Sequence, residues 1–111
     1  MPFRPSSVTV HPSTQAKLDK VEELAAENKQ PGQAVWTGLQ TAVSRIKSDG
    51  QWGELIPPGS IPRVYIQTYG ITNLYRVDLP SFHRMFYTIR GRDVVVIDLV
   101  DHEEFDRLMK M

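Results

Sequence analysis

The sequence predicts an α+β domain, in which a short strand and a helical hairpin pack on an antiparallel three-strand meander and a short helix ends the chain. Three observations support this fold class. Residues 71–100 contain three consecutive strand-like runs with short joints, residues 13–48 contain two apolar stripes at helical spacing, and residues 7–11 alternate briefly before a proline. At 111 residues the chain has the usual size of one domain, so we expect a single domain over residues 1–111.

A short strand precedes the first helical region. Residues 7–11 alternate in polarity and end at Pro12, which predicts a strand at the edge of the sheet or beside its last strand. Ser13 and Thr14 are candidate N-caps, because their hydroxyls can accept hydrogen bonds from the first free backbone N–H groups. Apolar residues then recur at helical spacing, so we expect an amphipathic helix that ends near Asn28.

A second helix is predicted after Pro31, which is tolerated in a first helical turn, and it closes at Asp49-Gly50. The connection between the two helices is short, which predicts an antiparallel helical hairpin. Residues 51–60 are rich in Pro and Gly and are interpreted as a loop. Residues 61–70 fit either a short helical turn or an irregular strand. The apolar stripe of the second helix consists of Val35, Trp36, Leu39, Ala42, Val43 and Ile46.

Three strands are predicted next. Side chains alternate between two faces along the first two strands, and the third strand is rich in Val and Ile. Arg76, Asp78 and Arg84 fall on one face, so we expect one apolar and one charged face. The joints at Pro80-Ser81 and Gly91-Arg92 are short, which specifies the register locally. The apolar face comprises Tyr75, Val77, Leu79, Met85, Tyr87 and Ile89.

The chain ends with a predicted short helix. Asp101 is its candidate N-cap, and Glu104 follows three residues later. Phe105, Leu108 and Met109 supply a small apolar stripe, so this helix is expected to be amphipathic.

Composition excludes several classes of protein. The sequence contains no cysteine, so neither disulfides nor thiolate metal sites are available. His11, His83 and His102 are scattered and no Gly-rich phosphate loop is present, so no cofactor or metal is expected. No apolar run approaches the length of a membrane span, and the first residues lack the apolar core of a signal peptide. We therefore expect a soluble cytoplasmic protein that does not associate with a membrane.

The charges balance overall but are unevenly distributed. Thirteen Lys and Arg residues stand against thirteen Asp and Glu residues, which gives a formal net charge of zero. Five arginines lie in residues 61–92, where Asp78 is the single acid, and acids dominate on both sides. This distribution predicts a local basic surface over the strands, flanked by acidic ends. Arg90 and Arg92 are interpreted as solvated charges of a hairpin.

The strand sequences resemble those of a known family. The runs Leu74-Tyr-Arg-Val-Asp-Leu79, Phe82-His-Arg-Met-Phe-Tyr-Thr-Ile89 and Val94-Val-Val-Ile-Asp-Leu-Val-Asp-His102 are similar to the strand pattern of the RelE/ParE toxin superfamily. That family places a helical hairpin before the meander and a short strand at the N-terminus. The resemblance therefore implies a RelE/ParE-like fold over almost the whole chain.

The resemblance also implies a function and a set of site residues. RelE-like toxins cleave mRNA in the ribosome, through attack of a ribose 2′-OH on the adjacent phosphate. Arg84 matches the arginine of the family's Tyr-Arg segment, and Arg76 matches a basic position on the preceding strand. Both are expected to hold phosphate, because a guanidinium can bind it through two hydrogen bonds. His102 or His83 would transfer a proton, since the pKa of a histidine is ordinarily close to neutrality.

The sequence departs from the family pattern at three positions. Asp78 occupies a position where active members tend to carry a cation, Glu103 stands where a basic residue is common, and Phe105 is the residue nearest to an expected tyrosine. These departures and the zero net charge favour an alternative, in which the site has lapsed and the protein acts as a protein-interaction module.

The resemblance further implies a partner. Toxins of this superfamily are neutralised by an antitoxin segment that wraps their α/β surface. An edge of the sheet, or the groove beside the helical hairpin, is expected to receive such a segment by strand addition or helix docking. We therefore expect a cognate antitoxin or a homodimer, and the ribosome and mRNA as further partners of an active toxin.

Overall fold

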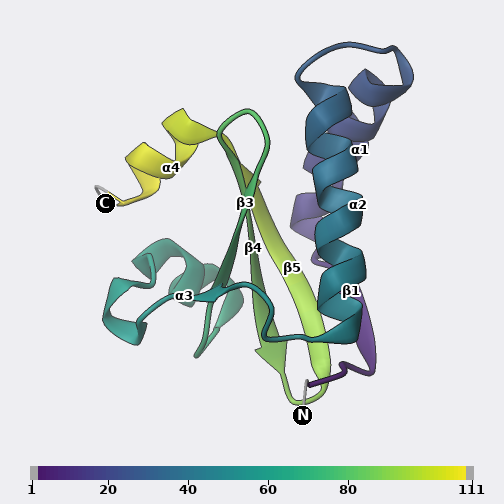
Figure 1. Cartoon of the computed structure of the whole chain (residues 1–111). Helices are drawn as coiled ribbons and strands as arrows, with labels where there is room; N and C mark the ends of the chain where they lie inside the picture. Colours follow the sequence, from purple (N-terminus) through teal and green to yellow (C-terminus); the bar gives the residue numbers. More distant parts are fainter. Residues whose placement is uncertain (1–2, 110–111) are drawn as a thin grey trace.

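A five-stranded sheet lies between two layers of helices in the computed structural model, which describes residues 3–109 (Figure 1). The helical hairpin covers one face of the sheet, and two shorter helices lie on the other face. The predicted α+β class is confirmed. In chain order the elements are β1 (Ser7–Val10), α1 (Pro12–Ala26), α2 (Gly32–Ser48), β2 (Glu54–Leu55), η1 (Pro58–Ser60), α3 (Arg63–Tyr69), β3 (Tyr75–Leu79), β4 (His83–Arg90), β5 (Asp93–Val100) and α4 (His102–Met109).

The sheet has the strand order β1-β5-β4-β3-β2. The predicted meander of β3, β4 and β5 is confirmed, and Gly91 has the positive φ of 62° that its tight joint to β5 requires. β1 lies at the edge beside β5, as predicted, and it runs parallel to β5, so the complete sheet is mixed although its meander is antiparallel. Alternating polarity shows that a segment is a strand without showing its direction, so the sequence did not predict this parallel pairing.

The segment between α2 and β3 is more regular than predicted. Residues 51–60 were expected to form a loop, but Glu54 and Leu55 pair with Arg76 and Tyr75 as the edge strand β2. Two paired residues are too few to show a period of two, so the strand left no signal in the sequence. The open choice for residues 61–70 is decided in favour of a helix, α3, which ends at Gly70 in the left-handed conformation.

The first helix begins earlier than predicted. Its N-cap is His11, whose Nδ1 accepts from the backbone N–H of Ser13, and neither Ser13 nor Thr14 is the cap. Pro12 can occupy the first helical position because the N–H that it lacks would have no partner there. Thr14 is instead buried, and its hydroxyl donates to the carbonyl of Ile97 in β5.

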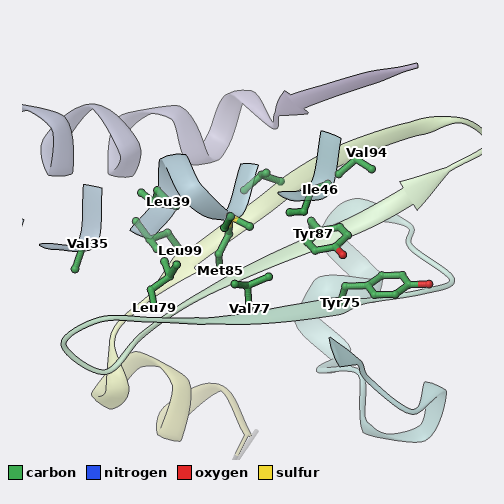
Figure 2. Close-up of a cluster of buried hydrophobic side chains, with 12 residues drawn as sticks. Val35, Leu39, Ile46, Tyr75, Val77, Leu79, Met85, Tyr87, Val94 and Leu99 are labelled. Carbon is green, nitrogen blue, oxygen red and sulfur yellow. The ribbon is translucent and has the colours of Figure 1, made fainter. Parts of the chain in front are cut away.

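The hairpin face of the sheet carries the larger core. The two helices approach closely where Gly32 lies against Leu24, since a Cβ on Gly32 would come within 2.5 Å of the Leu24 Cβ. Figure 2 shows side chains of α2 and of the three central strands converging between the helix and the sheet. The fully buried members include Val35, Ala42, Ile46, Met85, Tyr87, Val94 and Val96. The sequence pattern predicted the strand members of this core correctly.

The opposite face of the sheet was predicted to carry charged side chains, and this prediction is correct for only part of the face. Arg76, Asp78 and Arg84 do lie there, at the end of the sheet that leads into α4. However, the same face also buries a second apolar cluster under α3 and α4, because the segment before β3 folds back onto it. That cluster consists of Ile61, Tyr65, Ile71, Leu74, Phe86, Ile97 and Val100. No helix within residues 3–109 is long and apolar enough to cross a membrane.

Candidate functional site

Two arginines meet on the α3/α4 face of the sheet. Arg84 of β4 lies directly opposite Asp78 of β3 in the antiparallel register, and Arg76 precedes Asp78 by two residues on the same strand face. The Asp78 Oδ1 atom lies 3.3 Å from the Arg84 Nε and 3.4 Å from the Arg76 Nε. The exposed Asp78 carboxylate therefore bridges both guanidinium groups, and these groups compensate its negative charge.

Arg76 has a second acidic partner and an unused donor. Its Nη2 donates to Glu54 of β2, whose carboxylate lies 2.5 Å away. Its Nε is buried and makes no hydrogen bond, because the 3.4 Å contact with Asp78 lacks hydrogen-bond alignment. We treat that contact as electrostatic attraction alone. The Arg76 guanidinium is thus held between two carboxylates, and its Nε is shielded from solvent.

A hollow of about 210 Å³ opens beside Arg76. Phe105 of α4 and Phe86 of β4 line it, and their rings are stacked with centroids 6.1 Å apart. The Arg84 guanidinium lies over the Phe105 ring, 4.0 Å from its centroid. The site therefore combines two guanidinium groups with aromatic walls, which suits a ligand that carries both a phosphate and a flat ring.

The two predicted histidines are placed differently. His83 lies on the hairpin side of the sheet, where it lines another cavity with Lys20 of α1, and its Nδ1 contacts the Ser81 carbonyl at 2.8 Å. His102 begins α4 on the same end as Arg84, and its Nε2 lies 3.3 Å from Asp106. The structure brings the two arginines together. It separates His83 from them by the thickness of the sheet.

Sequence reasoning missed two contributors to the site. Glu54 lies in the segment that was interpreted as a loop, so nothing in the pattern placed it opposite Arg76. Phe105 was placed in the apolar stripe of the last helix and noted as a departure from the family, but its contact with Arg84 was not predicted. The bridging position of Asp78 could have been found, because the short joint between β3 and β4 sets the pair of Asp78 and Arg84.

A second polar cluster joins four elements near the end of β5. The Asp98 carboxylate accepts from the Tyr65 hydroxyl at 2.7 Å and from the Lys17 ammonium at 2.9 Å, and Lys17 also donates to Glu104 at 3.0 Å. Burial, followed by the charge of Asp98, raises the pKa of Tyr65 well above its ordinary value. Burial lowers the pKa of Lys17, but its hydrogen bonds to Asp98 and Glu104 outweigh burial, so that the pKa is raised. The cluster ties α1, α3 and α4 to β5.

No group of three or more side chains suited to hold a metal ion occurs in the described part of the chain. The sequence matches no model of a known protein family, and comparison with curated proteins finds no match either. The assignment of a function therefore depends on the geometry of the site.

Proposed function

We propose that this protein is a RelE-like toxin of the RelE/ParE superfamily, a ribosome-dependent mRNA endoribonuclease that inhibits translation in the cytoplasm. The observation that carries the proposal is the pair of Arg76 and Arg84, adjacent on one face of the sheet and beside a hollow with aromatic walls. The order of strand, helical hairpin, meander and helix is also the order that the family resemblance implies.

The proposed chemistry needs three groups. A ribose 2′-OH gives up its proton and attacks the adjacent phosphate, the bond between phosphorus and the 5′-oxygen of the next nucleotide breaks, and that 5′-oxygen takes up a proton. Arg76 and Arg84 stabilise the negative charge that grows on the phosphate oxygens. The hollow beside Phe105 and Phe86 receives the neighbouring base by stacking. For proton transfer the geometry favours His102 over His83, because His102 lies on the same end of the sheet as Arg84.

Expression in a host tests this proposal. We expect the unmodified protein to arrest growth and translation and to produce cleaved mRNA on ribosomes, and we expect Arg84→Ala and Arg76→Ala to abolish both effects. Arg63→Ala is the matched control, because Arg63 is an exposed arginine at the start of α3 and lies outside the site. A protein that is expressed in folded form without arresting growth or cleaving mRNA contradicts the nuclease assignment.

A second candidate function is a catalytically lapsed RelE/ParE-fold protein that acts through a protein partner. One observation favours it: both site arginines already have carboxylate partners, Asp78 and Glu54, so the pair offers little uncompensated charge to a phosphate. Ribosome binding distinguishes the two functions. Binding that weakens steeply with salt and is lost in Arg84→Ala supports the nuclease, and its absence supports the interaction module.

The proposed partner is a cognate antitoxin or a second copy of the chain. A cavity of about 380 Å³ lies between the helical hairpin and the sheet, with the apolar side chains of Val10, Leu18 and Trp36 among its lining. An apolar segment of an antitoxin is expected to dock there. A small protein encoded beside this chain, or concentration-dependent dimerisation in sedimentation, is the expected result. A monomer at high concentration with no such neighbour contradicts the partner and weakens the toxin assignment.

A further inference from the structure

The N-terminal segment, the end of α2 and the β4–β5 hairpin meet at one end of the molecule (Figure 1), and together these segments carry five cationic residues. The backbone N–H of Gly50 donates to the carbonyl of Phe3 at 2.6 Å, which joins the end of α2 to the N-terminal segment. The guanidinium of Arg92 donates to the carbonyl of Arg4 at 3.3 Å, which joins the hairpin to the same segment. We call this surface the basic end. It comprises Arg4, Arg45, Lys47, Arg90 and Arg92.

The basic end lies far from the arginine pair. Arg84 and Arg90 stand near opposite ends of β4, and six residues of strand span about 20 Å. The two surfaces therefore cannot share a single phosphate group. A ligand that contacts both must be a chain of several nucleotides or a larger assembly.

The cations of the basic end differ in their pairing from most of the others, although Arg63 and Arg107 also form no ion pair in the described part of the chain. Lys17, Lys20, Lys29, Arg76 and Arg84 each lie within 4.0 Å of a carboxylate. Within residues 3–109, none of the five cations of the basic end forms an ion pair, and all five are exposed.

Two acids nearby offset part of the positive charge. Asp49 accepts a hydrogen bond from the backbone N–H of Gln51, and Asp93 lies opposite Arg90 and accepts one from the hydroxyl of Ser7. Neither carboxylate forms an ion pair in the described part of the chain. Five cations against two acids leave an excess of positive charge at this end, although the net charge of the whole chain is zero.

We propose that the basic end is a second nucleic-acid-binding surface, which holds the phosphate backbone of RNA. Four of its five cations are arginines, whose planar guanidinium groups match phosphate oxygens. Trp52, which follows α2 and is 44% exposed, offers a ring on which a base can stack. Cations without a carboxylate partner can each replace counterions on the RNA, and this release drives binding.

A purely structural role explains only part of the basic end. Arg45 and Lys47 lie in the last turn of α2, where positive charge stabilises the helix dipole. Arg90 donates to the carbonyl of Tyr69 at the C-terminal end of α3, where its charge also meets a helix dipole. Arg4 and Arg92 do not lie at a helix end, so the dipole does not account for these two. If these cations were only solvated surface charges, nothing would explain why three separate chain segments bring them to the same end of the molecule.

Salt dependence measures the number of phosphates that the surface contacts. For about four contacts with single-stranded RNA, the logarithm of the binding constant falls with the logarithm of salt concentration at a slope of about −3. Affinity then falls about 50-fold between about 50 and about 200 mM salt. The full chain and a fluorescently labelled single-stranded oligoribonucleotide suffice for this titration, so it does not depend on the proposed nuclease activity.

The decisive variant is Arg45→Gln combined with Lys47→Gln, because both side chains are exposed and Gln preserves helix propensity. We expect the salt slope to become shallower by about 1.4 and the affinity at low salt to fall by about tenfold or more. The matched control is Lys20→Gln combined with Lys29→Gln, which removes two exposed cations that are already paired with Glu23 and Glu27. The control is expected to change affinity less than about twofold.

A second variant, Arg92→Gln, tests the hairpin, with thermal unfolding to confirm that the protein remains folded. Absence of salt-dependent RNA binding by the unmodified chain overturns the proposal, as does an equal loss in the paired-lysine control. Tighter binding to phosphatidylserine vesicles than to RNA, lost in the same variant, would identify a membrane surface and also overturn it. Arg84→Ala separates the two proposals, since it is expected to abolish cleavage, while the Arg45→Gln and Lys47→Gln pair still makes the salt slope shallower by the same amount in the Arg84→Ala background.

Discussion

The two faces of the sheet are built from the same three strands but differ in the side chains that they leave accessible. The cavity of about 380 Å³ on the hairpin face is lined mainly by apolar side chains, whereas Arg76 and Glu54 line the hollow on the other face. On the hairpin face, α2 closes over side chains such as Ile46, Met85 and Tyr87, which are all inaccessible to solvent. On the other face, α3 and α4 leave a hollow between them, beside which Arg76 remains 23% exposed. Alternate residues of one strand thus contribute to a closed core and to an open, charged surface.

This difference indicates that the hairpin face mainly stabilises the fold and that the other face carries the candidate site. The closed face buries most of the apolar area and is expected to determine stability. The open face buries the smaller apolar cluster under α3 and α4, and beside that cluster it carries arginines, a carboxylate bridge and a hollow. Substitutions on the two faces should consequently separate effects on unfolding from effects on RNA binding.

The largest expected effect is on the closed face. Ile46→Ala should lower the free energy of unfolding by about 3 kcal/mol, because it leaves a cavity against the sheet where no solvent reaches. Ile66→Ala is the same change on α3, where the side chain is 43% exposed, and should cost less than about 0.5 kcal/mol. Urea titrations of both variants measure the difference. Equal losses would contradict the division between the faces.

The Tyr87 hydroxyl connects the closed face to the segment that follows α2, and its removal tests this contact. The Tyr87 hydroxyl donates to the Gly50 carbonyl at 2.7 Å and accepts from the Gly53 N–H at 2.9 Å. Tyr87→Phe leaves both backbone groups without this partner and should cost about 2 kcal/mol. Tyr75→Phe is the control, because the Tyr75 ring stacks on Tyr87 but its hydroxyl points away from the core in Figure 2. The control should stay within about 0.5 kcal/mol in the same urea assay.

Alkaline titration compares one tyrosine on each face. Burial, the largest cause, raises the pKa of Tyr87 to about 12, and burial together with Asp98 raises the pKa of Tyr65. Because the folded-state pKa exceeds the ordinary value of about 10, the associated stability is complete below about pH 10 and is lost as pH rises through the folded-state pKa. We expect the melting temperature to fall above about pH 10, and to fall less in Tyr65→Phe and Tyr87→Phe. Unchanged alkaline curves in both variants would refute this account.

A substitution on the open face is expected to have the smallest effect on the free energy of unfolding but a clear effect on RNA affinity. Asp78→Asn removes the charge that bridges the two arginines, and because this carboxylate is 65% exposed, unfolding should change by less than about 1 kcal/mol. RNA affinity at low salt should rise about threefold to tenfold, since two cations lose their shared acid. Glu27→Gln changes net charge equally at a remote, exposed pair and should leave affinity nearly constant. An equal rise in both variants would show a general charge effect.

The sequence predicted the closed face better than the open one, for a physical reason. Tyr75, Met85 and Tyr87 repeat every second residue along adjoining strands, so their shared face follows from strand geometry. Glu54 reaches Arg76 through a pair of residues too short to show any period. Phe105 covers Arg84 through the docking of α4, which depends on tertiary packing that no local pattern records. Asp78 was recognisable, but its bridging role required the register.

The parallel pairing of β1 with β5 has a consequence for how the chain folds. It joins Ser7 to Asp93, so it closes a loop of 86 residues that contains nearly every other element. The β3, β4 and β5 meander pairs neighbouring segments and loses far less chain entropy on forming. We therefore expect β1 to dock last, with a folding φ-value near zero for Val8→Ala and a higher one for Ile89→Ala. During synthesis, β1 leaves the ribosome before β5 and can pair with it only after β5 has also been made.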